Sequence, residues 1–307
     1  MTSAVSANEG DPRVDPRLPY LVLLVVVFVW GAGPVVAKLI TAPPVVGASI
    51  RFGISIPVLF AIVHLRGRRV SLQTIRTAAP AGLAFGINLL FVFETVQEAT
   101  VAVLAVAVTL QPAVILLIAG PLFGERATPA HVVGTVVGIV GAATVILGAG
   151  GELRSSALGV VFALSAMATF TVYFVLTRVA RSRTDVDPVE WMAAINMWSF
   201  IAIIPPALFL AEPADFGLVD GRDWFWLLVL AYITGVVGHI LMSWTHGYVE
   251  ASRSSLALLA MNIVAVGLAW PVHGESVTWI QALGGLVVLG AVTAVLRIPP
   301  DRSQPDP

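Results

Sequence analysis

Six side chains that could bind or orient a small ligand lie near the middle of long apolar segments. They are Trp30, Asn88, Gln111, Tyr173, His239 and Asn262. An aromatic ring offers a flat apolar surface, whereas an amide can bind polar groups without requiring one charge. An amide buried in hydrocarbon without a partner costs roughly 2–7 kcal/mol. We therefore expect a shared, ligand-binding cavity, with mutual hydrogen bonds that only hold helices together as the alternative.

Titratable groups inside apolar segments are candidates for proton transfer. His239 shares a helical face with Gly235, Met242 and His246, and its imidazole could carry a proton or hold a substrate carboxylate. A hydrogen-bonded structural histidine is the alternative. Glu94 and Glu98 lie one helical turn apart near the end of another segment. These carboxylates could line a water-filled entrance or take part in proton coupling. Protons are thus a possible coupling partner.

Patterns for catalysis, metal binding and nucleotide binding are missing from the sequence. The chain has no Cys, and its single lysine, Lys38, follows Ala37 and so lies outside any P-loop motif. The acidic pair Asp185 and Asp187 precedes Pro188 and Glu190, a pattern typical of a helix start with Asp187 as N-cap. The net charge of −1 does not favour nucleic acid as a binding partner. We expect no enzyme, no metal site and no cofactor.

The elements that position these residues are predicted to be membrane-spanning helices. The chain has 307 residues, of which 58% are hydrophobic and 11% charged, and its mean hydropathy is +0.92. A helix needs about 20 apolar residues to cross a bilayer. Ten segments meet this length, at 19–40, 44–65, 77–97, 99–122, 128–148, 156–177, 188–211, 224–247, 251–272 and 277–297. The sequence therefore predicts an all-α integral membrane protein.

Positive charges give the expected orientation, because cytoplasmic connections are enriched in Lys and Arg. With the N-terminus inside, thirteen arginines lie on the cytoplasmic side: Arg13, Arg17, Arg66, Arg68, Arg69, Arg76, Arg126, Arg178, Arg181, Arg183, Arg253, Arg297 and Arg302. Only Lys38, Arg154 and Arg222 lie outside, and Arg51 falls within the second segment. We expect a multi-pass protein of the cytoplasmic membrane with both termini cytoplasmic, a disordered tail at 1–18 and a C-terminal tail at 299–307.

An internal repeat becomes visible when the chain is shifted by 150 residues. The shift places Pro121, Gly124, Glu125, Thr128 and Gly134 on Pro271, Gly274, Glu275, Thr278 and Gly284. We assign a first repeat to 19–150 and a second to 151–298. Each contains five spans, an odd number, so the two repeats must be inverted. Inverted repeats around a midplane site are a hallmark of secondary transporters.

Several short motifs resemble one known family. The turn Gly124-Glu125-Arg126 before a Gly-rich span is similar to the repeat signature of the drug/metabolite transporter superfamily, in particular its EamA-type ten-helix members. Trp30-Gly31 followed by Lys38 resembles the family's first helix, and Arg51-Phe52 resembles the Arg-Phe of its second. This resemblance implies packing or orientation as the role of Arg51. It also implies transport of small solutes such as amino acids, drugs or other metabolites, commonly outward.

Two positions depart from the family pattern. The family usually has Pro in both the fourth and ninth helices, but this chain keeps Pro112 and places Asn262 at the matching position, while Ser276 replaces the Arg of the turn. The leading prediction is a secondary transporter of small metabolites, with a small-molecule substrate and membrane lipid as its partners. Multidrug efflux and a non-transporting membrane scaffold or sensor are the alternatives.

Overall fold

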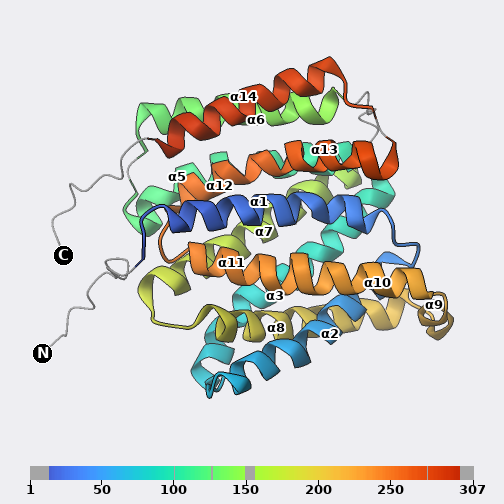
Figure 1. The fold of residues 1–307 in the computed structure, drawn as a ribbon. Coiled ribbons are helices and arrows are strands. Elements are labelled where there is room, and N and C mark those ends of the chain that lie inside the picture. The colour runs from blue at the N-terminus through green and yellow to red at the C-terminus, as the bar shows by residue number, and fades with distance from the viewer. Residues whose placement is uncertain (1–13, 100, 126, 149–155, 275, 298–307) are drawn as a thin grey trace, which may run out of the picture.

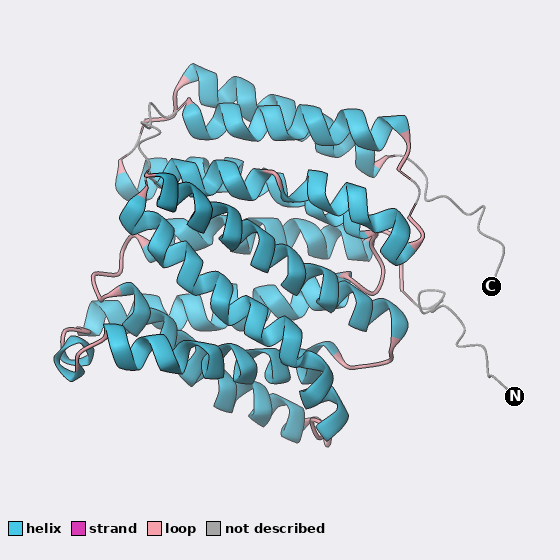
Figure 2. Ribbon diagram, turned by 180° about the vertical axis from the view of Figure 1, so that it is seen from behind, coloured by secondary structure: helices cyan, strands magenta, loops and turns pink. Residues whose placement is uncertain are grey.

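The protein is described by a computed structural model covering residues 14–99, 101–125, 127–148, 156–274 and 276–297. The regular elements in these ranges are all helices (Figure 2). Most of the predicted N-terminal tail, all of the C-terminal tail, and Arg126, Arg154 and Glu275 of the sequence patterns lie outside the described residues.

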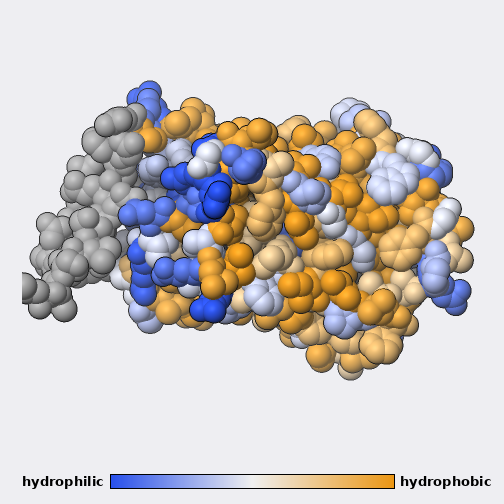
Figure 3. All heavy atoms as spheres, turned by 90° about the horizontal axis from the view of Figure 1, so that it is seen from below, coloured by the Kyte–Doolittle hydropathy of each residue, from blue (hydrophilic) through white to orange (hydrophobic). Residues whose placement is uncertain are grey.

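Ten helical stretches within these ranges are long and apolar enough to cross a membrane, as the sequence predicts. Seven are single helices: α1 (Leu18–Ala37), α2 (Pro44–Leu65), α3 (Leu72–Glu98), α6 (Pro129–Leu147), α7 (Ala157–Arg183), α8 (Pro188–Leu210) and α14 (Trp279–Leu296). Hydrophobic side chains form a band on the surface between two more polar ends (Figure 3). This distribution is the one expected of a multi-pass membrane protein.

Three of the ten spans are interrupted. The fourth consists of α4 (Val101–Thr109) and α5 (Gln111–Phe123). The eighth consists of α10 (Gly221–Val229), a π-helix η1 (Leu230–Val237) and α11 (Gly238–Thr245), and the ninth of α12 (Ala251–Ala257), a 3-10 turn η2 (Leu258–Ala260) and α13 (Met261–His273). A short helix, α9 (Pro213–Gly217), connects α8 to α10. Hydropathy predicted the extents of these spans but not their internal changes of helix type.

Helix α1 begins and α14 ends at the same end of the bundle, on the left in Figure 1. We call this the terminal end and the opposite one the far end. Helices α6 and α14 lie side by side along one edge, and α3 packs between α7 and α8. The remaining spans surround a core shared by both halves of the chain.

Glycines allow the close helix contacts in the bundle. A Cβ at Gly82 would lie 2.5 Å from Cβ of Trp198, and one at Gly86 would lie 2.6 Å from Cβ of Ala202, so α3 and α8 approach closely only because both positions are Gly. A Cβ at Gly134 would likewise overlap Val295 on α14.

The two copies of the repeated turn have the same local geometry. Gly124 and Gly274 both have φ of 71°, a left-handed conformation that favours Gly, and both end a helix. Thr128 and Thr278 then cap α6 and α14 through their side chains, each in a capping box. The repeat seen in the sequence is therefore a repeat of structure.

Candidate functional site

Five rings from four spans meet in the interior of the bundle. They form the aromatic cluster, defined here as Trp30, Phe85, Phe170, Tyr173 and His239. The His239 ring lies 4.6 Å from the Trp30 ring and 4.7 Å from the Phe85 ring, and Phe85 stacks on Tyr173 at 4.6 Å. The Tyr173 hydroxyl and His239 Nδ1 form a hydrogen bond of 2.8 Å. The cluster thus combines apolar ring faces with one polar pair.

The π-helix η1 holds Trp30 in place. The indole Nε1 of Trp30 donates to the Thr234 carbonyl oxygen at 3.1 Å. A Cβ at Gly238, directly after η1, would lie 2.6 Å from Trp30 Nε1, so the ring can occupy this position only beside Gly. π-helical turns often occur at functional sites.

Three of the six predicted residues, Trp30, Tyr173 and His239, come together in the aromatic cluster. Asn88 lies one turn from Phe85 on α3, and its Nδ2 donates to the Ala166 carbonyl oxygen on α7 at 2.7 Å. It therefore links two helices beside the cluster. Sequence analysis missed Phe85 and Phe170, because a Phe in an apolar span gives no signal that separates a binding role from packing.

Gln111 and Asn262 lie instead at two helix interruptions. Gln111 is the first residue of α5; it is buried, and its Nε2 has no hydrogen-bond partner among the described residues. Asn262 is the second residue of α13, and its Nδ2 donates to the Leu259 carbonyl oxygen at 3.2 Å. Asn88 and Asn262 thus donate to main-chain carbonyls.

The two interruptions occupy corresponding positions in the repeats. Leu110, between α4 and α5, falls on Ala260 of η2 after the shift of 150 residues. At both places a backbone N–H bonds to the carbonyl three residues earlier, from Leu110 to Ala107 and from Met261 to Leu258. Each interruption is one tightened turn within its span, and in inverted-repeat transporters discontinuous helices at matching positions mark the binding site.

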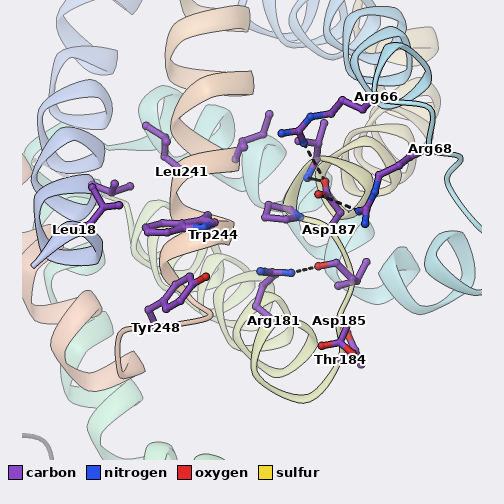
Figure 4. Close-up of a pocket in the computed structure, with 15 residues that line it drawn as sticks. Leu18, Arg66, Arg68, Arg181, Thr184, Asp185, Asp187, Leu241, Trp244 and Tyr248 are labelled. Carbon is purple, nitrogen blue, oxygen red and sulfur yellow. Dashed lines mark hydrogen bonds and ion pairs between the residues drawn. The ribbon is translucent and has the colours of Figure 1, made fainter. Parts of the chain in front are cut away.

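A pocket of about 780 Å³ opens at the terminal end (Figure 4). One wall carries Arg66, Arg68 and Asp187, where Arg68 pairs with Asp187 at 3.1 Å. The opposite wall includes Trp244 and Ile240 of α11. Ile240 of this wall follows His239 in the chain, but the residues that line the pocket do not include those of the aromatic cluster.

A buried polar cluster ties the repeats together at the terminal end. Glu125 accepts hydrogen bonds from the backbone N–H of Ala251 at 2.7 Å and from that of Ser252 at 3.1 Å, and so caps α12. Arg178 lies 3.7 Å from the same carboxylate and also donates to the His246 carbonyl oxygen. The Glu of the repeated turn is thus a connection between the two halves of the chain.

A second connection lies at the far end. Asp223, at the start of α10, is 1% exposed and accepts hydrogen bonds from the backbone N–H groups of Thr41 and Ala42, both at 2.9 Å. This carboxylate binds the α1–α2 connection of the first repeat to the eighth span of the second.

The remaining acidic candidates lie near helix ends. Glu94 and Glu98 follow Val92, where the third apolar span ends, and Glu98 accepts a hydrogen bond from the Ser156 hydroxyl at 2.7 Å. Asp187 caps α8 by accepting from the backbone N–H groups of Val189 and Glu190, as predicted. Among the described residues there is no group of three His, Cys, Asp or Glu side chains that could hold a metal ion.

Comparison with known proteins gives consistent matches over nearly the whole chain. The model of the EamA-like transporter family matches residues 17–147 and again 157–297. An uncharacterized transporter of Archaeoglobus fulgidus is 24% identical over 283 residues, covering 91% of this chain and 99% of the relative. The uncharacterized transporter YyaM of Bacillus subtilis is 25% identical over 223 residues, covering 70% and 71%. A crystal structure at 18% identity matches with a TM-score of 0.75 over 91% of this chain and 98% of that one, which shows the shared fold.

Proposed function

Because the chain belongs to the EamA-like transporter family, we propose that it is a secondary transporter that exports small metabolites, such as amino acids or related solutes, across the cytoplasmic membrane. The observation that carries this proposal is the pair of helix interruptions at corresponding positions of the two repeats. The cargo binds at the aromatic cluster, with Gln111 and Asn262 orienting its polar groups.

Alternating access is the proposed mechanism. The pocket opens at the terminal end, and the two repeats are tied together at both ends, by Glu125 at the terminal end and by Asp223 at the far end. Rocking of one repeat against the other would break the Asp223 contacts and close the pocket. With the terminal end in the cytoplasm, the pocket would be the cytoplasmic entrance to the site.

Multidrug efflux is the second candidate, favoured by the ring faces of Trp30, Phe85 and Phe170 in the aromatic cluster. Competition between transported metabolites and bulky apolar cations separates the two, because a drug pump would bind the latter more tightly.

A solute screen on proteoliposomes, with and without a pH gradient, tests the proposed function. We expect at least one metabolite to move in the parent protein and the rate to fall in Asn262→Leu, which removes the amide. If no solute moves, the proposal fails. If Asn262→Leu matches the parent in folding and in transport of every cargo, Asn262 has no part in the site. A His239→Gln variant with the parent's rate at every pH between about 5.5 and 8 would exclude this histidine from proton coupling.

A further inference from the structure

Arg51 places a positive charge in the interior of the bundle. It is partly buried on α2, and its Nε and Nη2 lie 3.5 and 3.7 Å from the position of a Cβ at Gly235. Gly235 lies near the middle of the span Gly221–Thr245 and one helical turn before His239. The guanidinium therefore lies at the depth of the candidate site.

This guanidinium has no acidic partner and no hydrogen-bond acceptor within the described part of the chain. The acidic side chains nearest to the interior are already placed elsewhere: Asp223 binds Thr41 and Ala42 at the far end, and Glu94 follows the end of its apolar span. A charge at membrane depth is costly unless it is paired.

Arg51 lies beside the aromatic cluster. Its guanidinium carbon lies 6.0 Å from the centre of the Phe52 ring, and the Phe52 ring packs edge-on against Phe85 of the cluster at 5.6 Å. Gly235 adds no side chain between the guanidinium and η1. One cation without an ionic partner among the described residues therefore lies beside the packed rings of the aromatic cluster.

We propose that Arg51 binds the anionic group of the cargo and that the cargo is a small monocarboxylate with an aromatic or apolar body. This assignment rests on the proposed transport function and specifies its substrate class. A guanidinium presents parallel N–H donors that match the two oxygens of a carboxylate, and the ring faces of Trp30 and Phe85 would pack against the apolar part. Binding would supply the partner that Arg51 lacks.

Three probes with one ring and different charges test the proposal: phenylacetate, phenylacetamide and 2-phenylethylamine. Their dissociation constants are measured from ligand-induced thermal stabilisation of the full-length protein in lipid nanodiscs. In the parent we expect phenylacetate to bind about 10–100-fold more tightly than the amide or the amine, the range for hydrogen bonds to charged groups. Arg51→Gln should abolish this preference. Arg51→Lys should retain part of it, because the charge stays and the paired donors are lost.

Arg76→Gln is the matched control, because Arg76 is exposed near the start of α3, and this change should leave the preference intact. The preference of the parent is a test by itself if Arg51→Gln does not fold. Equal or tighter binding of the amide or the amine, or an unchanged preference in Arg51→Gln, overturns the proposal. Binding of none of the probes also overturns it, whereas movement of any solute in the liposome screen would still support transport.

Discussion

Gly238→Ala is expected to displace Trp30 from the aromatic cluster. The new Cβ would lie 2.6 Å from Trp30 Nε1, 2.9 Å from its Cδ1 and 3.1 Å from Cγ1 of Val29. Ordinary contacts between heavy atoms lie near 3.5–4.0 Å. The indole ring must therefore move by about 1 Å, which breaks its hydrogen bond to Thr234 and its contact with His239.

The expected cost follows from these contacts. Overpacking a well-packed site costs about 1–3 kcal/mol, and the lost hydrogen bond about 1 kcal/mol. Replacing Gly by Ala within a helix stabilises the folded state by about 1 kcal/mol. The net loss in the free energy of unfolding is about 1–3 kcal/mol.

Thermal unfolding of the purified protein measures this loss, and cargo affinity measures the displacement of Trp30. Gly290→Ala is the matched control, because a Cβ there meets no atom within 4 Å and should be neutral or stabilising. The smaller ring of Trp30→Phe should relieve the clash, so the two changes should be non-additive. Equal stability and cargo affinity for Gly238→Ala and the parent would refute the account of how Trp30 is held.

Three further predictions concern the two ends of the bundle. Glu125→Ala should destabilise the protein by about 3–5 kcal/mol, because it leaves Arg178 without its carboxylate. The control Glu98→Gln, at an exposed position, should cost less than about 1 kcal/mol. Equal unfolding temperatures for the two variants would contradict the role of Glu125 as a connection between the repeats. Burial and the charges of Arg178 and Arg181 lower the pKa of His246 below its ordinary 6.5. Below pH 6.5 the unfolded chain binds a proton at His246 that the folded chain does not bind. The free energy of unfolding should therefore fall with falling pH, by at most about 1.4 kcal/mol per pH unit. Unfolding temperatures measured over a pH series should change less in His246→Gln than in the parent, and parallel curves would exclude this contribution of His246. The parent has no Cys, so with the terminal end in the cytoplasm an impermeant thiol reagent should label Asp220→Cys but not Ser71→Cys in intact cells; the reverse pattern would invert the orientation.

Much of the fold could be predicted because span length and charge are properties of the sequence itself. Ten apolar segments became ten spans, and the repeated Gly and Thr of the turns became helix ends with the same geometry. Trp30, Tyr173 and His239 were grouped by counting depth along each span, which works because each helix rises by a constant amount per residue.

The helix interruptions were harder to predict. Pro112 signals the break before α5, since Pro lacks the N–H that a continuous helix needs. The equivalent turn Leu258–Ala260 contains neither Pro nor Gly. At this level α1 packs closely on the ninth span, because a Cβ at Gly31 would lie 2.8 Å from the Met261 carbonyl oxygen. This change of helix type accompanies a tertiary contact that no local pattern records.

The π-helix also fixes the rotational phase of the eighth span. In η1 the hydrogen bonds skip one residue more than in an α-helix, so Leu230–Val237 behaves as a helix with an inserted residue. If Leu230–Val237 were wound as an α-helix without loss of a residue, everything beyond it would turn by roughly 100°. His239 would then leave the face that meets Trp30 and Tyr173, while the length and hydropathy of the span would hardly change. The wider turn thus separates a span that presents this imidazole to the interior from one that crosses the membrane equally well without doing so.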